Sequence, residues 1–310
     1  MKKKMNFEIV DNQKNIKVTV LENGEEKAKA ICYFQNTPKQ NGEKIGTIGE
    51  MDILDKQYGV ILLEKCEEIL KQKGLHYVVA PMNENTWGKY RTMKQSKGEP
   101  LFSLENVNPM CDNDLLIKAD YQEIYTYTST KGKLEDAYQS QSIEIMRQKI
   151  QEEGIAIRKL NKENYMEDLK KIYHVSLKSF ARNPLYTPID EESFLKQYIP
   201  YVHLADEDII LLAEKDGKEI GFIFCIPDFE EAKRGEKINT IIVKTVAVIL
   251  EFQKFAIGNV LLSDIANIAK QKGFENWICA FMYANNTSQK MAKRNQTEVI
   301  REYALYGKKI

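Results

Sequence analysis

The sequence predicts an α/β (α+β) fold in two domains, each a mixed, mostly antiparallel twisted sheet flanked by helices. Short apolar and β-branched runs recur between turn signals, which is typical of strands. In the second half of the chain, strands stand before and after one central strand–helix–strand unit, which favours a mixed sheet. The 310 residues also exceed the usual size of a single core, so two domains are expected.

The first half is expected to be rich in strands. Two strands lie within residues 16–34, on either side of a turn at 22–24, and a third lies within 44–53. The run GVILLEKCEEILKQKG, residues 59–74, has apolar residues at helical spacing and ends in a Lys-Gly stop signal. A strand is expected directly after it, within 75–81.

The second half repeats this order with more elements. Its predicted elements are a strand (154–160), a helix (164–180), a hairpin turning at Asp216-Gly217 (206–226), a long strand (238–250), a helix (259–273), a strand (276–282), a short helix and a final strand (299–310). Leu261, Ile265 and Ile268 share one face of the 259–273 helix.

Composition and charge exclude several classes of function. Lys plus Arg and Asp plus Glu both number 45, so the chain lacks the positive charge typical of nucleic-acid binders. No apolar run of about 18 residues occurs, and no long one follows the N-terminal lysines, so a soluble cytoplasmic protein without a membrane partner is expected. The five cysteines are odd in number and widely spaced, and the three histidines are isolated, which favours buried thiols and no metal site.

An internal repeat relates the two halves. With Gly59 set against Gly258, the next fifteen positions align without a gap and end in an identical Lys-Gln-Lys-Gly at 71–74 and 270–273. Both helical segments are followed by a strand. We therefore interpret the chain as the product of a duplication.

The duplication predicts the domain boundaries. Residues 1–130 form a degenerate domain, 131–152 the linker region and 153–310 the second domain. The six residues ending at the aligned glycine read LDKQYG in the first copy, with Asp52 and Asp55 close by, and QKFAIG in the second. Because carboxylates beside a cluster of N–H groups repel an anion, only the second copy is expected to bind a phosphorylated ligand.

The stretch QKFAIG joins a predicted strand to a predicted helix. The first turn of a helix leaves N–H groups unpaired and carries a partial positive charge, so such a junction is a physical anion site. Ala256 and Gly258 are small enough for a ligand to approach the backbone closely. Gln253 and Lys254 add a hydrogen-bond donor and a cation toward a pyrophosphate.

This region resembles the GNAT superfamily of acyl-CoA-dependent N-acyltransferases, whose loop reads Gln/Arg-x-x-Gly-x-Gly/Ala before a helix. Gln253, Ala256 and Gly258 match that loop in order, with Ala256 in place of its first glycine. The resemblance covers residues 155–310, and the first half is similar to a second, degenerate GNAT-like domain.

The resemblance implies that acetyl-CoA is the cosubstrate. The strand before the loop would splay from the 276–282 strand and admit the pantetheine arm, and the loop would hold the pyrophosphate. The acceptor, a small-molecule or peptide amine, would enter from the other side, over residues 179–194. The residues that the resemblance places at the cofactor are Val246, Ala247, Val248, Gln253, Lys254, Phe255, Ala256, Ile257, Gly258, Asn259, Asn285 and Ser288.

Catalysis in this class is mostly positioning of amine and thioester, with a base for the ammonium proton and often a tyrosine that protonates the leaving thiolate. The position where the superfamily usually has that tyrosine is Ala292 in this chain. The resemblance leaves Tyr303 as the acid, with Tyr283 and Tyr306 as substitutes, and Glu251 as a base that acts directly or through water.

Alternative roles stay open for several of these residues. Lys244 and Thr245 are both candidates to line the site. For Lys244 the alternative is an ordinary surface position. Asn285 and Asn286 also fit N-caps of the following helix. Residues 81–87 pack between the domains or contact the acceptor.

The leading interpretation is an N-acetyltransferase that acts on a primary amine, as a monomer or homodimer. The alternative is a non-catalytic module that binds acyl-CoA or a partner, because Ala292 and Ala256 replace the usual tyrosine and glycine. A third class, a tandem-domain aminoacyl transferase that uses charged tRNA, is disfavoured by the balanced charge and by the absence of a helical-hairpin insertion. A polyamine, an aminoglycoside, an amino acid and a peptide N-terminus are all compatible acceptors.

Overall fold

The computed structural model describes residues 4–105, 113–137, 139–202, 205–284 and 286–310. The predicted class is confirmed, because a large, mostly antiparallel sheet is flanked by helices. The strands are β1 (Met5–Asp11), β2 (Asn15–Glu22), β3 (Glu25–Tyr33), β4 (Lys39–Gln40), β5 (Glu43–Lys44), β6 (Gly46–Ile53), β7 (Tyr77–Ala80), β8 (Thr92–Ser96), β9 (Gln122–Lys133), β10 (Ile155–Lys159), β11 (Ile210–Lys215), β12 (Lys218–Pro227), β13 (Thr240–Val248), β14 (Asn276–Tyr283) and β15 (Glu298–Lys309). The α-helices are α1 (Lys56–Gln72), α2 (Asn113–Lys118), α3 (Gln141–Glu152), α4 (Tyr165–Phe180), α5 (Glu191–Tyr198), α6 (Phe229–Lys233), α7 (Ile257–Gln271) and α8 (Thr287–Arg294).

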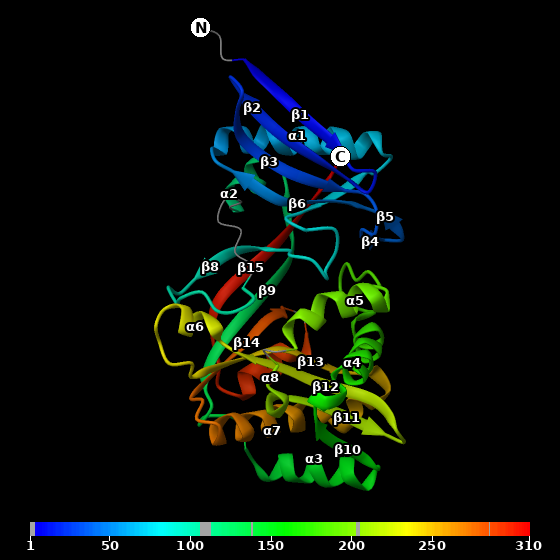
Figure 1. The fold of residues 1–310 in the computed structure, drawn as a ribbon, viewed down its shortest axis with the longest axis vertical. Coiled ribbons are helices and arrows are strands. Elements are labelled where there is room, and N and C mark those ends of the chain that lie inside the picture. The colour runs from blue at the N-terminus through cyan, green and yellow to red at the C-terminus, as the bar shows by residue number, and fades with distance from the viewer. Residues whose placement is uncertain (1–3, 106–112, 138, 203–204, 285) are drawn as a thin grey trace.

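One 13-stranded sheet runs through both halves of the elongated molecule (Figure 1). Its order is β1-β2-β3-β6-β7-β15-β9-β14-β13-β12-β11-β10, and β8 also pairs with β15. The pairs β6–β7 and β13–β14 are parallel, each joined through a helix, whereas the other pairs are antiparallel. Both strand–helix–strand units predicted from the sequence are therefore present.

The two halves exchange their last strands. β9 follows α2 of the first half but pairs with β14, and β15 at the end of the chain pairs with β7. β9 and β15 pair with each other between the two halves. The sequence predicts a sheet for each domain, whereas the structure joins them, because each half's last strand extends the sheet of the other. The predicted linker, 131–152, contains the end of β9 and the whole of α3.

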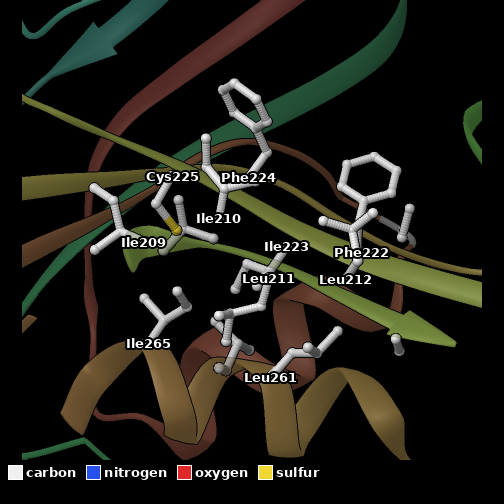
Figure 2. Packing of buried hydrophobic residues seen from close by; sticks show 14 of the residues in the cluster. Ile209, Ile210, Leu211, Leu212, Phe222, Ile223, Phe224, Cys225, Leu261 and Ile265 are labelled. Atoms are coloured by element: carbon white, nitrogen blue, oxygen red, sulfur yellow. The ribbon is translucent and has the colours of Figure 1, made fainter. Parts of the chain in front are cut away.

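Helices cover both faces of the sheet in the second half. α7 packs on one face against β11, β12 and β13, and α4 packs against β12 and β13. Leu261 and Ile265 of α7 are fully buried and point toward the sheet, whereas Phe222 and Phe224 of β12 point to the opposite face (Figure 2). Burial of each such side chain stabilises the fold by roughly 1.5–3 kcal/mol relative to exposure.

The first half is simpler. α1 packs on β2, β3 and β6 through buried Leu62, Cys66 and Leu70. β1 joins β2 through the short turn at residues 12–14, whereas α4 and α5 lie between β10 and β11 in the second half. The first half therefore has no counterpart of the segment predicted to cover the acceptor.

Local signals from the sequence are confirmed in detail. α1 and α7 are each followed by a glycine in the left-handed region, Gly74 with φ of 81° and Gly273 with φ of 86°, as the stop signals predict. The four described cysteines are free and buried. Within the described ranges, no helix is both long and apolar enough to cross a membrane.

Candidate functional site

Strands β13 and β14 diverge in the middle of the second half. They pair only over residues 240–243 of β13 and 276–279 of β14. β13 then continues to Val248 and β14 to Tyr283, each still paired with its other neighbour, β12 or β9. In the described part of the chain, the divergence leaves one side of residues 244–248 without a neighbouring strand.

Irregular residues mark the point of divergence in both strands. The register between β12 and β13 shifts at Lys244, which becomes the extra residue of a β-bulge. In β14, Phe281 has a left-handed φ of 55°, and the register with β9 shifts at the same place. The N–H of Phe281 donates to Ser129 Oγ over 3.1 Å. Because bulges bend and twist a strand, these irregularities account for the divergence.

Residues 249–256 connect β13 to α7 and contain the 3₁₀ helix η4 (Leu250–Phe255). Gln253 Nε2 donates to the Val248 carbonyl over 3.0 Å, which ties the loop to the end of the strand. Ala256 has φ of 58° and ψ of 27°. This left-handed conformation costs a non-glycine residue about 1–2 kcal/mol, which explains the glycine that the resembling loop has here.

The first turn of α7 has no side-chain cap, because Ala256 occupies the N-cap position. Its N–H groups and the positive end of the helix dipole are therefore not compensated by a side chain. A Cβ atom on Gly258 would lie 3.3 Å from Met291 Cε and 3.5 Å from Val246 Cγ1. The glycine thus lets α7 begin close to both β13 and α8.

The segment after β14 carries two more predicted cofactor residues. Asn285 lies outside the described residues. Asn286 Oδ1 accepts a hydrogen bond from the Thr287 N–H over 2.7 Å, so its predicted capping role is confirmed. Ser288 Oγ is buried and has no hydrogen-bond partner in the described part of the chain. Since a buried hydroxyl without a partner is costly, a polar ligand group fits at this position.

The remaining predicted cofactor residues differ in what they offer a ligand. The side chains of Ala247, Val248 and Ile257 are buried in the core, so only their backbone groups can face the gap or the loop. Lys254 is exposed, and its ammonium lies 4.9 Å from the centre of the Phe255 ring. The Asn259 N–H donates to the Ala256 carbonyl over 2.9 Å.

The two predicted catalytic residues lie in different surroundings. Glu251 is exposed on η4. Tyr303 is fully buried in β15, and its hydroxyl donates to Glu105 Oε1 over 2.6 Å and accepts from Ser129 Oγ over 3.3 Å. Burial, and then the hydrogen bond to Glu105, raises the pKa of Tyr303 well above its usual value. Both catalytic roles stay predictions.

Residues 169–296 match the model of the acetyltransferase (GNAT) family. The match includes β13, the loop, α7, β14 and α8, the elements that form the site described above. These residues are a GNAT domain. Members of this family transfer acyl groups from acyl-CoA.

Solved structures extend the similarity to the whole fold. A GCN5-related glucosamine N-acetyltransferase region of a fungal multi-domain GH3 beta-N-acetylglucosaminidase has a TM-score of 0.56 and 12% identity over 95% of this chain, which spans 33% of that protein. A GCN5-related N-acetyltransferase from Sphaerobacter thermophilus has a TM-score of 0.54 and 13% identity, with 97% of this chain and 82% of the other covered. A tandem GNAT protein from the clavulanic acid biosynthesis pathway has a TM-score of 0.52 and 9% identity, with 95% and 82% covered. At these identities the similarity concerns the fold alone. A search of curated protein sequences finds no match.

Three observations in the GNAT domain fit an acyl-CoA ligand. The open side of residues 244–248 can pair with amide groups, and the uncapped start of α7 can hold an anion. The buried Ser288 Oγ is available for a hydrogen bond.

The predicted acceptor segment, 179–194, is held by the first half of the chain. Trp87 Nε1 donates to the Thr187 carbonyl over 2.8 Å, which confirms the predicted packing of residues 81–87 between the domains. The Trp87 ring also packs against Tyr186 and Phe194, with ring centres 6.3 and 5.7 Å away. The first half therefore packs directly against the predicted acceptor segment.

Sequence reasoning missed two residues near the site. Glu105 is buried with Arg301, which donates to its Oε1 from Nε over 3.1 Å, and no local pattern marks such a carboxylate. Tyr198 accepts a hydrogen bond from Lys244 Nζ over 3.0 Å. Its spacing of four from Phe194 places both on one face of α5, which is a signal that the sequence did contain.

Another hollow, of ≈ 990 Å³, lies beside the start of α4, away from the diverging strands. Arg158 lines it and pairs with Asp168 and Glu214 at 2.6 and 2.7 Å. Lys171 also pairs with Glu214 at 2.8 Å, so two cations balance two carboxylates, and the arrangement is explained as a structural ion-pair network.

Proposed function

We propose that this chain is an N-acetyltransferase that transfers the acetyl group of acetyl-CoA to a primary amine. The observation that carries the proposal is the uncapped start of α7 directly beside the gap between β13 and β14, within a GNAT domain. This arrangement offers backbone groups for the pantetheine amides and a positive helix end for the pyrophosphate.

In this proposal each part of the loop has its own role. The backbone of Val246 and Val248 pairs with the pantetheine arm, and the N–H groups of Ile257 and Gly258 bind the pyrophosphate. Gln253 fixes the loop through its bond to the Val248 carbonyl. Lys254 adds a positive charge from the exposed side, and Ser288 contacts the ligand from α8.

The reaction forms a C–N bond between the amine nitrogen and the thioester carbonyl carbon and breaks the C–S bond. Glu251 accepts the ammonium proton directly or through water, and Tyr303 is the proposed source of the proton that the thiolate takes up. Most of the rate then comes from holding the amine against the thioester in a dry, fixed geometry.

The proposal assigns the two halves different tasks. Residues 153–310 bind acetyl-CoA and acceptor, whereas residues 1–130 are a degenerate copy that binds no acyl-CoA and supports the acceptor segment through Trp87. One acetyl-CoA per chain is therefore expected.

Calorimetry with acetyl-CoA tests the binding step, with one site per chain as the expected result. A thiol reagent then follows CoA release with a panel of amines that includes polyamines, aminoglycosides, amino acids and peptides. The full chain is used, and circular dichroism verifies that it is folded. A folded chain that gives no heat of binding at millimolar acetyl-CoA contradicts the proposal.

The burial of Tyr303 favours one alternative, a module that binds acyl-CoA without catalysis. This alternative predicts the same calorimetric result but no CoA release with any amine. The two functions are therefore separated by the thiol measurement alone.

A further inference from the structure

Lys244 stands at the point where β13 leaves β14. It directly follows Val243, the last β13 residue paired with β14, and it is the bulged residue against β12. Its side chain reaches Tyr198 of α5 and Phe224 of β12. Because Phe224 points to the face opposite α7, Lys244 lies on the acceptor side of the sheet (Figure 2).

The ammonium group of Lys244 has no anionic partner among the described residues. Its Nζ donates to the neutral Tyr198 hydroxyl over 3.0 Å and lies 4.5 Å from the centre of that ring. Three other half-buried lysines of the same half each reach a carboxylate, at 2.8 Å for Lys171, 2.5 Å for Lys272 and 3.2 Å for Lys215. Partly buried charges are normally paired, so Lys244 departs from the pattern of its own domain.

Unpaired hydroxyl groups lie in the acceptor segment, which is linked to Tyr198 through a series of ring contacts. Tyr198 packs against Phe194, which packs against Trp87, and Trp87 packs against Tyr186. Tyr186 Oη is buried without a hydrogen-bond partner in the described part of the chain. Ser179 Oγ and Thr187 Oγ1, which lie in the same predicted acceptor segment (179–194), are also buried without a hydrogen-bond partner among the described residues. The acceptor segment, which Phe194 links to Tyr198, thus contains polar atoms that a ligand or water must satisfy.

We infer that Lys244 and Tyr198 bind a carboxylate of the acceptor, so that the substrate is a free amino acid whose amine is acetylated. This inference rests on the proposed function and names its acceptor class. One ammonium and one phenol offer two donors and a single positive charge, which matches the two oxygens and single negative charge of a carboxylate. A polyamine or an aminoglycoside would instead place further positive charges beside Lys244, which is unfavourable.

The experiment compares each of the twenty amino acids with its α-amide, at saturating acetyl-CoA, in the full chain. The expected result is a preference of about 10- to 100-fold in kcat/KM for at least one free amino acid, because charged hydrogen bonds are lost with the amide. In Lys244→Met, which keeps the packing against the rings, the ratio falls toward one through a raised KM for the amino acid. Lys244→Arg retains a preference, and Tyr198→Phe shows a smaller loss of about 3- to 10-fold.

Calorimetry of acetyl-CoA binding and thermal denaturation accompany each variant. The Kd of acetyl-CoA is expected to stay the same in Lys244→Met, which separates acceptor binding from cofactor binding and from misfolding. A wild-type chain that binds no acetyl-CoA overturns the proposed function itself. A chain that binds acetyl-CoA but prefers polyamines, or a Lys244→Met variant that keeps the preference, overturns the inference alone. Where no amine releases CoA, the binding of amino acids to the acetyl-CoA complex is measured by calorimetry. The absence of any heat of binding also overturns the inference.

Discussion

The two copies of the strand–helix–strand unit differ most where their helices begin. Only Leu54 and Asp55 separate β6 from α1, and the Asp55 carboxylate accepts a hydrogen bond from the Gln57 N–H over 3.0 Å. Residues 249–256 separate β13 from α7, and Ala256 offers no cap. The start of α1 is thus capped by a carboxylate of the chain, whereas the start of α7 has no side-chain cap among the described residues, as the proposed anion site requires.

The positions beside β6 and β13, the strands that precede the two helices, differ as well. After β7 the chain turns back along β6, where the Met82 N–H donates to the Ile48 carbonyl over 2.8 Å and the Glu50 N–H to Asn83 Oδ1 over 2.9 Å. After β14 the Ala284 N–H donates instead to the Thr126 carbonyl of β9, over 3.0 Å. The first copy therefore fills with its own chain the position that the second leaves beside β13. The same strand–helix–strand order is thus compatible with an open or a filled position beside its first strand.

Gly258→Glu is expected to have the largest effect on acetyl-CoA binding, because it places a carboxylate near the start of α7, as Asp55 does at the start of α1. A negative charge close to a bound pyrophosphate costs about 2–4 kcal/mol, so acetyl-CoA binding is expected to weaken by at least ~30-fold. Calorimetry measures the change.

Gly258→Gln is the matched control, since it adds similar bulk near Met291 without the charge. It is expected to weaken binding much less than Gly258→Glu. Equal losses in the two variants would mean that crowding, not charge, governs this position, and unaltered binding in Gly258→Glu would remove the pyrophosphate from the start of α7.

Asp55→Ala removes the cap of α1 and is expected to change free energy by less than Gly258→Glu does. Loss of an N-cap typically costs ~1 kcal/mol of folding stability, which urea denaturation measures. The number of acetyl-CoA molecules bound per chain is expected to remain one, because Met82 and Asn83 still fill the gap beside β6.

Glu64→Ala, at an exposed position of the same helix, is the control and is expected to change stability by less than ~0.5 kcal/mol. A second bound acetyl-CoA in Asp55→Ala would show that the cap alone closes the first copy. Stability equal to that of the Glu64→Ala variant would show that Asp55 does not cap α1.

Local features of this contrast could be predicted from the sequence. The helical spacing of apolar residues predicts α1 and α7, and the Lys-Gly signals predict their ends. The aspartates near Gly59 predict a first copy unsuited to anions, and the structure shows that one of them, Asp55, accepts a hydrogen bond at the start of α1. The predictions of the two helices and of their ends succeed because each depends on residues that are close together in the chain.

Features that depend on distant segments could not be predicted in this way. The exchange of β9 and β15 is a choice of partners between strands far apart in sequence, and periodicity within a strand does not specify its neighbour. Glu105 is an ordinary surface residue by composition and becomes buried only because Arg301 and Tyr303 arrive from the end of the chain. For the same reason the pairing of Lys244 with Tyr198 had no signal in the run around Lys244 itself.

Ala256→Gly has the smallest expected effect and tests the conformation of the loop itself. The left-handed φ of 58° strains alanine by about 1–2 kcal/mol, whereas the greater freedom of glycine in the unfolded chain offsets about 0.4–1 kcal/mol of the gain. A net stabilisation of ~0.5 kcal/mol is therefore expected in urea denaturation. Acetyl-CoA binding should be unchanged or slightly tighter, because the methyl group beside the start of α7 is removed.

Ala181→Gly provides the control of opposite sign, since Ala181 is exposed and has an ordinary helical φ of −53°. There glycine brings only the entropic cost, and a loss of ~0.5 kcal/mol is expected. If Ala256→Gly destabilises the chain as Ala181→Gly does, the left-handed conformation of Ala256 is refuted. If it instead weakens acetyl-CoA binding, the alanine methyl group contributes to the site, and the uncapped backbone of α7 is not sufficient to distinguish the second copy from the first.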